Sequence, residues 1–593
     1  MKTLLTKNQA YRNDIDGLKA LAIIAVVLYH MGFAVYGYLG VDIFLVVSGY
    51  LFINSLIKRN TKQFSFFMEF CNRLLRLYPL VLIACSICLV VGFFTMLPDD
   101  YENLSQSVVA TNLSANNILS YITTGNYWEV VNELKPLMHT WYLGILVQFY
   151  IVFLLLYKII MKVVKEEKRT AGVLIMLTAT TVLSLGAYLL PVFNSNLKFY
   201  MLPFRFFELS LGCLSAYIHL KWTKNLGVGK SLQPALPILA VALFLPFNFI
   251  PDTLRRLLVV GCTVCTVLCT NQSKPYSLIT SSKIAVAVGK ASFSIYIWHQ
   301  ILLAFTRYTV TTKFTVLVAA IYFAAVAAVS AFSYLFVEKR LGSVMKKHFV
   351  SSIIIIAIST ALISGAAGVI YLRAGVVRDV HELDITTKNV TRGMHSKYNH
   401  RIWQYENSSF EDNGKINILI VGNSYARDCA NVILESEFGS LVNISYSYSW
   451  NDDLIPIIKE ARFVFSQGLT KENVPEYVWN NIDNPENVYG IGTKRFGENN
   501  GIIYSQRFRS DYLKMTVSVP ESILSLNNEL LLSWGSKFIN FIELVQNADG
   551  TVPVFTPEGK FISQDCWHLT KAGAVMYAKK INWESIFVKG NLN

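Results

Sequence analysis

The sequence predicts a multi-pass α-helical membrane bundle followed by a C-terminal extracytoplasmic α/β domain with a parallel sheet. Of its 593 residues, 53% are hydrophobic and only 16% are charged, and the mean hydropathy is +0.40. Soluble globular chains carry about 25% charged residues, so this composition is typical of a membrane protein. Apolar runs long enough to cross a bilayer recur up to Tyr371, whereas the residues that follow have the pattern of a soluble domain.

Eleven apolar runs are predicted to span the membrane, ten in a bundle and one additional helix. Their ranges are 18–36, 39–57, 77–97, 141–160, 172–191, 206–220, 233–250, 255–270, 291–306, 314–336 and 350–371. The first run lacks a convincing small-residue cleavage site and is followed at once by another, so we expect it to remain as the first helix.

The distribution of basic residues predicts the orientation of the chain. With the N-terminus in the cytoplasm, twenty-four Lys and Arg residues fall on the cytoplasmic side and six in the external loops. This asymmetry is what the positive-inside rule predicts. It also explains the net charge of +14 without nucleic acid, which we set aside as a partner. An odd number of spans places everything after Tyr371 on the side of the membrane opposite the cytoplasm.

The C-terminal part alternates strand-like and helix-like segments. The strand-like runs are 416–421, 442–448, 462–466 and 488–491, and the helix-like runs are 425–436, 454–460, 528–546 and 570–580. This order predicts an α/β domain built on a parallel sheet. The preceding residues 376–414 are polar and weakly patterned, and we expect them to form a linker.

Ionisable residues within the apolar runs are the first candidates for chemistry, because a buried charge in a membrane is costly. His30 lies in the first span, and its imidazole can act as a general base near neutral pH. The alternative is a histidine that is merely hydrogen-bonded inside the bundle. Asp42 begins the next span, where it could pair with the region of His30. Arg205 and Glu208 are three residues apart within one span, which predicts a buried ion pair.

Arg73 and Arg76 are also three residues apart and share one helix face at the cytoplasmic side. Guanidinium groups bind phosphates in a bidentate manner, so the pair is a candidate phosphate clamp. The alternative is that both side chains only extend toward anionic lipid headgroups. At the outer interface, His139 and Trp141 stand in "PLMHTWYLGILVQFY".

In the outer half, Ser424 follows an apolar strand and opens a helix, where the dipole and free N–H groups can stabilise an anion. Asp565 and His568 lie three residues apart near the end of the chain, and the order Ser, Asp, His is one that a catalytic triad can adopt. The alternative is a turn serine and a surface histidine. Cys429 and Cys566 adjoin these segments, so a disulfide between them is a candidate. We expect no metal site.

The membrane half resembles the acyltransferase-3 family over residues 10–345. The resemblance rests on "DIDGLKALAIIAVVLYH", "GVDIFLVVSGYL", "RLLRLYP", "HTWYLGILVQFY", "LPFRFFELSLG", "GKASFSIYIWH" and "FSYLFVEK", in this order. It implies a membrane enzyme that O-acylates extracytoplasmic glycans, with His30 as the catalytic histidine. It also implies that Arg73 and Arg76 hold the phosphates of acyl-CoA, and that Lys19 stands where the family usually has arginine.

One departure from the family concerns the fourth predicted span. Many members have two acidic residues where this chain has Leu146 and Val147. Their role is either absent here or taken over by another carboxylate, for which Asp42 and Glu208 are the candidates.

The outer half is similar to the SGNH hydrolase family over residues 415–585. "VGNSYAR" matches the segment that carries the nucleophile, and "DCWHLTKAG" matches the segment with the aspartate and histidine. The resemblance implies Ser424 as nucleophile, His568 as base and Asp565 as its orienting partner. It also implies an oxyanion hole to which Gly468 and either Asn499 or Asn500 contribute.

These patterns together predict an enzyme that carries an acyl group from cytoplasmic acyl-CoA to hydroxyls of an extracytoplasmic glycan. Acetyl is favoured because it is small, so acetyl-CoA is the expected donor. Lipopolysaccharide O-antigen or another surface polysaccharide is favoured as acceptor, with peptidoglycan as the alternative. A transporter with a sugar-binding or esterase outer domain is the other alternative. The expected domains are 1–345 (acyltransferase), 346–375 (additional helix), 376–414 (linker) and 415–593 (SGNH-like).

Overall fold

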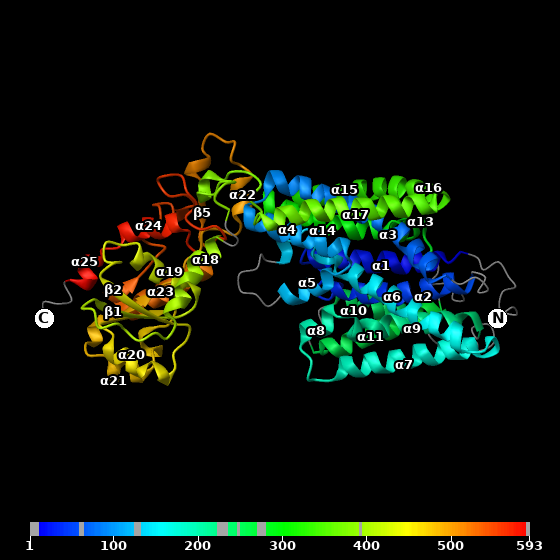
Figure 1. Cartoon of the computed structure of the whole chain (residues 1–593), viewed down its shortest axis with the longest axis horizontal. Helices are drawn as coiled ribbons and strands as arrows, with labels where there is room; N and C mark the ends of the chain where they lie inside the picture. Colours follow the sequence, from blue (N-terminus) through cyan, green and yellow to red (C-terminus); the bar gives the residue numbers. More distant parts are fainter. Residues whose placement is uncertain are drawn as a thin grey trace. The chain divides into compact units, whose positions relative to one another are not determined.

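The computed structural model describes residues 11–58, 65–123, 132–221, 235–245, 249–269, 280–390 and 394–588. Its residues cluster into two compact units. Unit 1 comprises Met1–Phe94, Asn103–Arg307 and Lys313–Tyr371, and unit 2 comprises Thr95–Glu102, Tyr308–Thr312 and Leu372–Asn593. Both units can be followed along the chain in Figure 1.

Unit 1 is helical. Its principal helices are α1 (Asn13–His30), α2 (Gly40–Lys58), α3 (Phe66–Thr95), α4 (Pro98–Asn112), α5 (Asn116–Thr123), α6 (Trp141–Val163), α7 (Arg169–Leu189), α8 (Ser195–Tyr200), α9 (Leu202–Lys221), α10 (Ala235–Phe244), α11 (Asp252–Cys269), α13 (Lys283–Lys290), α14 (Ser292–Thr309), α15 (Val316–Ser333), α16 (Gly342–Lys347) and α17 (Phe349–Leu372). A π-helical turn, η7 (Tyr334–Leu341), joins α15 to α16.

Within the described residues, six helices are long and apolar enough to cross a membrane. They are Gly37–Ile57, Phe66–Thr95, Met138–Val163, Glu166–Leu189, Val316–Lys347 and Phe349–Leu372. Each overlaps a predicted span. The other five predicted spans coincide with or overlap the shorter or more polar helices α1, α9, α10, α11 and α14.

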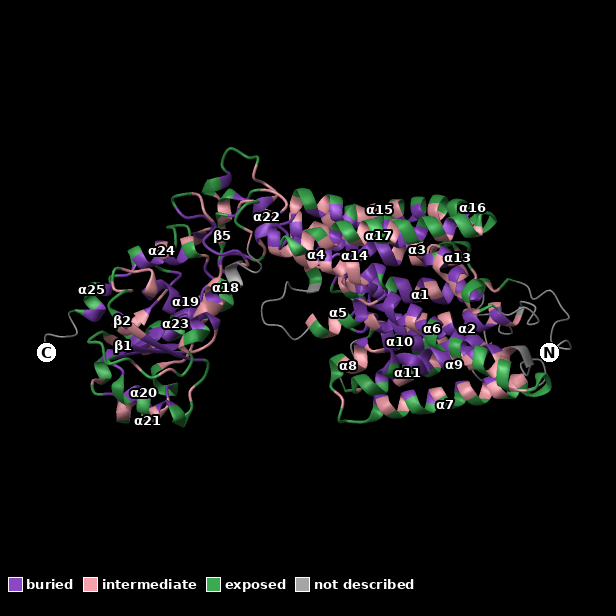
Figure 2. Cartoon of the chain, in the orientation of Figure 1, coloured by how far each residue is buried: buried purple, intermediate pink, exposed green. Residues whose placement is uncertain are grey.

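Burial separates the inner from the outer helices of unit 1. Figure 2 shows buried residues gathered on α1 and α2, whereas α15, α16 and α17 are mostly exposed or intermediate. Only 11% of the most apolar stretch of α17 is buried, whereas 67% of the corresponding stretch of the helix Gly37–Ile57 is buried. An apolar helix that the protein does not bury is what a lipid-facing span presents.

The first predicted span, 18–36, is placed differently in the structure. Helix α1 begins at Asn13 and ends at His30, followed by Met31 as its C-cap and by Gly32 with φ +84°. A left-handed glycine after the last turn is a common way to stop a helix. His30 is therefore the last residue of α1 and does not lie in the middle of a span.

Unit 2 is built on a five-stranded sheet with the order β2-β1-β3-β4-β6. The strands are β1 (Ile416–Val421), β2 (Val442–Ser447), β3 (Phe463–Gln467), β4 (Val488–Ile491) and β6 (Phe538–Ile539), and every pair is parallel. The predicted parallel sheet and its four strand-like runs are confirmed. Strand β6 was not predicted, and the small antiparallel pair of β5 (Thr516–Ser518) and β7 (Thr551–Pro553) was not either.

Helices cover the sheet of unit 2. They include α19 (Ser424–Leu434), α20 (Ile455–Glu460), α21 (Glu476–Asn481), α22 (Asn500–Tyr504), α23 (Glu521–Trp534), α24 (Lys571–Lys580) and α25 (Trp583–Phe587). The helix predicted at 528–546 is wrong in its bounds, because α23 ends at Trp534, where Gly535 takes φ +55° and the chain turns toward β6. The sequence of that region is apolar enough for either structure.

The segment 376–414, expected to be a linker, is folded into unit 2 where it is described. It carries α18 (Met394–His400) and a 3-10 turn at Arg401–Tyr405. Ile402 is fully buried in the core around the sheet, and Val376 and Val380 are buried with Phe555 and Phe561. The segment has few apolar residues among many polar ones, so its composition predicted a linker although these apolar side chains are buried.

Candidate active site

The sheet of unit 2 presents Ser424 at the carboxyl end of β1. Gly422 follows the strand with φ +144°, and a Cβ there would lie 2.6 Å from Gln467 Cβ, so only glycine allows this turn. Asn423 caps the helix, because its Oδ1 accepts a hydrogen bond from Tyr425 N at 2.9 Å. Ser424 is then the first residue of α19, and it is fully buried. Ligand sites of open parallel sheets lie at this edge.

The loop before α24 brings His568 and Asp565 to Ser424. His568 Nε2 lies 2.8 Å from Ser424 Oγ, and His568 Nδ1 lies 2.5 Å from Asp565 Oδ2. The other carboxylate oxygen of Asp565 accepts hydrogen bonds from the backbone N–H groups of Trp567 and His568, both at 2.8 Å. Because the carboxylate can only accept, Nδ1 donates to it and Nε2 is left to take the serine proton. This is the geometry of a serine nucleophile with its base and orienting acid.

A second buried network lies behind the triad and was not predicted. Asp428, one turn after Ser424, accepts from Lys494 Nζ at 2.6 Å, from Leu569 N at 3.1 Å and from Asn399 Nδ2 at 2.6 Å. Asn399 Nδ2 also donates to the carbonyl of Ser424 at 3.1 Å. The carboxylate of Asp428 thus connects α19 to Leu569, the residue that follows His568. The sequence offered one indication of this network, because Lys494 follows the apolar strand β4 at the same edge of the sheet as Ser424.

Replacing Asp428 by asparagine should destabilise unit 2 by about 3–5 kcal/mol, because it leaves the Lys494 ammonium buried without its counter-charge. Denaturant unfolding of the full chain in detergent, followed by the fluorescence of its tryptophans, measures this loss. The double variant Asp428→Asn with Lys494→Met should lose less than the sum of the single variants. Additive losses would show that the two side chains are not coupled.

The three candidates for the oxyanion hole, Gly468, Asn499 and Asn500, are engaged elsewhere. The backbone N–H of Gly468 donates to the carbonyl of Ile491 at 3.1 Å. Asn499 caps α22 through its Oδ1, which accepts from Gly501 N at 2.7 Å, and its Nδ2 donates to the carbonyl of Tyr308 at 3.3 Å. Asn500 donates to the carbonyls of Ser563 and Gln564. The structure therefore does not present these groups as donors for a substrate oxygen.

The candidate disulfide between Cys429 and Cys566 is not formed. Both are free thiols, and Cys566 Sγ donates to Asn500 Oδ1 at 3.2 Å. Cys429 lies on the face of α19 that packs into the core of the sheet, and burial raises its pKa to about 12. Burial also raises the pKa of the Cys566 thiol. Thiolates are needed for disulfide exchange, and burial disfavours them at both positions.

In unit 1, Asp42 does not pair with His30. Its Oδ1 lies 3.1 Å from Arg205 Nη1 and 2.9 Å from Arg256 Nε. The predicted ion pair between Arg205 and Glu208 is present at 2.9 Å, and all four side chains are buried. Asp42 and Glu208 therefore neutralise two arginines from α9 and α11 inside the unit. Sequence spacing could not show this, because Arg256 is more than two hundred residues from Asp42.

The two predicted residues of the outer interface lie close together in the chain but have different neighbours. His139, in the 3-10 turn η5 (Met138–Thr140), packs its ring against Tyr296 with centroids 4.9 Å apart. Trp141 opens α6 and packs against Phe199, with centroids 4.6 Å apart. Both predicted residues are buried.

The basic residues expected at the cytoplasmic side have unequal surroundings. Lys19 Nζ pairs with Asp16 Oδ1 at 2.7 Å. The Arg73 guanidinium hydrogen-bonds Ser55 and lies 4.8 Å from the centroid of the Phe52 ring. Arg76 is exposed and makes no hydrogen bond or ion pair with the part of the chain that the structure describes, although its charge acts on Lys19. Arg76 is thus the best placed of the three to bind a phosphate from solution.

If Arg76 binds a CoA phosphate, Arg76→Ala should raise the KM for acetyl-CoA about 10- to 100-fold, the value of one charge-assisted hydrogen bond. Initial rates of CoA release by membrane vesicles measure this. The KM for S-acetylpantetheine, which lacks the nucleotide phosphates, should not change. Lys346→Ala, at an exposed basic residue of α16, is the matched control. Equal effects on both thioesters would show that Arg76 does not bind the phosphates.

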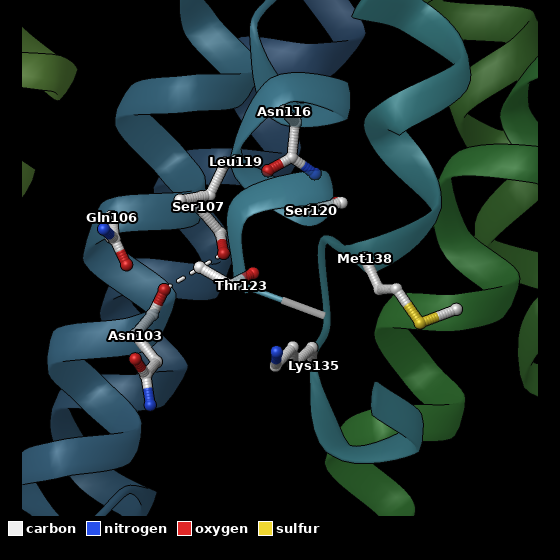
Figure 3. A pocket seen from close by; sticks show the side chains of 9 residues that line it. All are labelled: Asn103, Gln106, Ser107, Asn116, Leu119, Ser120, Thr123, Lys135 and Met138. Carbon is white, nitrogen blue, oxygen red and sulfur yellow. Dashed lines mark hydrogen bonds between the residues drawn. The ribbon is translucent and has the colours of Figure 1, made fainter. Parts of the chain in front are cut away.

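A small hollow lies in unit 1 between α4, α5 and the turn that precedes α6. Figure 3 shows its lining, which includes Gln106, Asn116, Lys135 and Met138. Met138 is the neighbour of His139 in η5, so the hollow borders the turn that carries this histidine. Among the described residues, no group of three or more His, Cys, Asp or Glu side chains is arranged to hold a metal ion.

Comparison with known proteins places this chain. A family model described as an acyltransferase domain matches residues 12–337, which is more than half of the chain. The chain belongs to the acyltransferase-3 family. It is 28% identical over 329 residues to the peptidoglycan O-acetyltransferase OatA of Listeria monocytogenes, which covers 52% of this chain and 51% of that relative.

It is also 26% identical over 348 residues to the O-acetyltransferase OatA of Staphylococcus aureus strain NCTC 8325, covering 55% of this chain and 57% of the relative. A putative O-acetyltransferase of S. aureus strain MSSA476 is 26% identical over 321 residues, with 51% of this chain and 52% of the relative covered. The acyltransferase-3 chain described here thus spans about half the length of the relatives it matches. No solved structure matches it significantly.

Proposed function

We propose that this protein is a membrane-bound O-acetyltransferase that transfers acetyl from cytoplasmic acetyl-CoA to hydroxyls of an extracytoplasmic glycan. The observation that carries the proposal is the arrangement of Ser424, His568 and Asp565 in a chain whose other half belongs to an acyltransferase family. The donor is made inside the cell and its phosphates cannot cross the membrane, so donor and acceptor must be used on opposite sides.

In this proposal, residues 1–345 form the acyltransferase domain, with ten spans, and 346–375 an additional helix, with the N-terminus in the cytoplasm of a bacterial inner membrane. Arg76, with Arg73 and Lys19 nearby, binds the CoA phosphates, and His30 assists cleavage of the thioester. On the outside, residues 415–593 form an SGNH-like domain. Six apolar helices and the asymmetric distribution of basic residues support this topology.

The chemistry at Ser424 follows from the triad. His568 Nε2 takes the proton of Ser424 Oγ as the oxygen attacks the acetyl carbonyl, and Asp565 stabilises the imidazolium that forms. The group that delivered the acetyl then leaves with the proton from His568, so that an acetyl ester remains on Ser424 and His568 returns to neutral imidazole. A glycan hydroxyl then attacks this ester, with His568 accepting its proton, and Ser424 recovers a proton as the acetylated glycan leaves.

The acceptor that we propose is lipopolysaccharide O-antigen or another surface polysaccharide. The Listeria relative is named a peptidoglycan O-acetyltransferase, which supports peptidoglycan as the second candidate. A transporter or a glycan esterase is less consistent with the family of the membrane half.

Inside-out membrane vesicles that contain the full chain test the proposal. With acetyl-labelled CoA outside the vesicles and lumenal acceptor inside, label should appear on the glycan as an alkali-labile ester. Supplying either surface polysaccharide or peptidoglycan fragments identifies the acceptor. Label that stays on CoA, or that appears only as free acetate in the presence of both acceptors, would contradict glycan transfer.

A further inference from the structure

Three histidines that are distant in sequence lie ring to ring inside unit 1. They are His30 at the end of α1, His139 in η5 and His299 in α14. The ring centroids of His30 and His299 are 5.4 Å apart, and those of His139 and His299 are 5.3 Å apart. His299 is thus the middle ring of the three. The function proposed above uses only His30.

The hydrogen bonds of His299 determine which of its nitrogens carries the proton. Nδ1 lies 2.7 Å from the carbonyl oxygen of Tyr296 and 3.1 Å from that of Ile295. Because a carbonyl oxygen can only accept, the proton of the neutral ring must be on Nδ1. Nε2 therefore carries a lone pair and is the basic nitrogen of His299.

That lone pair is buried without a hydrogen bond from any described residue. His299 is 0% exposed, and no donor reaches its Nε2 in the part of the chain that the structure describes. A buried acceptor left unsatisfied costs about 1–3 kcal/mol, and native proteins keep few of them. Nε2 of His299 is thus a buried acceptor in a ring that packs against the ring of His30.

Side chains of neighbouring helices hold the three rings in place. His139 is a second imidazole next to His299, and neither of its ring nitrogens has a hydrogen bond within the described residues. Tyr322 OH donates to the carbonyl of His299 at 3.1 Å, and Tyr296 OH donates to the carbonyl of His139. Arg307 Nη2 donates to the carbonyl of His30 at 2.8 Å, while Arg307 Nη1 pairs with Glu133 at 3.2 Å. The carboxylate of Glu133 is thus paired with Arg307.

We propose that His299 is the positioning and proton-accepting partner of His30 in acetyl transfer. The inference rests on the proposed role of His30 as the base of the membrane half. The proton that His30 takes from the nucleophile attacking the thioester passes from its ring nitrogen to Nε2 of His299. His30 returns to neutral imidazole, and His299 becomes imidazolium with its Nδ1–H still on the carbonyl of Tyr296. One N–H bond breaks and one forms, and the proton returns by the same route to the sulfur of the departing CoA. His139 packs against the ring of His299 that receives the charge.

The variant His299→Asn separates the two nitrogens. The asparagine amide can still donate to the Tyr296 carbonyl from the position of Nδ1, but nothing replaces the base at Nε2. In vesicles with the full chain, kcat for CoA release from acetyl-CoA should fall about 10²-fold, within the usual range for general acid–base groups. The KM for acetyl-CoA should stay within about twofold, because His299 is not expected to touch the donor.

His219→Asn is the matched control, since it makes the same substitution at another histidine of unit 1, where the ring packs against Tyr50. It should leave kcat unchanged. Should His299→Asn fail to accumulate in the membrane, His299→Gln serves the same test, because its amide also lacks a base. Wild-type kcat in the variant that accumulates, or a raised KM with unchanged kcat, would overturn the inference. Full activity of His30→Ala would instead refute the proposed function, so the two failures are distinguishable.

Discussion

Replacing Ser424 by alanine is expected to remove covalent acetylation of the outer domain and to lower glycan acetylation at least about 10³-fold. The hydroxyl of Ser424 donates to His568 Nε2 at 2.8 Å, and the start of α19 holds it there. Without this oxygen, the imidazole has no nucleophile to activate. Few single changes in the chain should have a larger effect on activity.

Two measurements on the full chain test this expectation. Labelled acetyl that remains bound after denaturation reports the ester, and hydrolysis of p-nitrophenyl acetate reports the triad without the membrane half. Both should be lost in Ser424→Ala. Ser445→Ala is the matched control, because Ser445 is another fully buried serine of unit 2, on β2. A stable labelled ester in Ser424→Ala would mean that another side chain is the nucleophile.

The parts of this site that the sequence could predict are those set by local order. An apolar strand ending at Gly422 and a helix beginning at Ser424 can be recognised from neighbouring residues. Asp565 and His568 are three residues apart, so their contact is also local. Since parallel strands all end at the same edge of a sheet, one expects the distant histidine loop to be able to reach the serine.

The parts that could not be predicted depend on partners from distant segments. Whether the N–H of Gly468 is available depends on Ile491 of the neighbouring strand, which takes it. The pairing of Asp428 with Lys494 requires that β4 ends beside α19, and spacing along the chain does not reveal this. For the same reason, Asp42 was expected near His30 although it neutralises Arg205 and Arg256.

His30→Ala is the second change from which we expect a large effect, in the opposite half of the chain. CoA release from acetyl-CoA should fall about 10²- to 10⁴-fold, since this substitution removes the base of the membrane half. Hydrolysis of p-nitrophenyl acetate by the triad of unit 2 should remain at the wild-type rate. Ser424→Ala, by contrast, should abolish the hydrolysis of p-nitrophenyl acetate. The two variants together therefore assign one step to each half of the chain.

Mixing the two variants in one membrane makes the test more stringent. If each chain delivers acetyl only to its own Ser424, co-reconstituted His30→Ala and Ser424→Ala chains should acetylate no more glycan than either variant alone. Recovery of transfer would show that acetyl leaves one chain and is captured by another, as a diffusible intermediate would require. Loss of p-nitrophenyl acetate hydrolysis in His30→Ala would contradict the separation of the steps, because this residue belongs to unit 1 and the triad to unit 2. If the steps are separate, thioester cleavage belongs to unit 1, where the rings of His30 and His299 pack together.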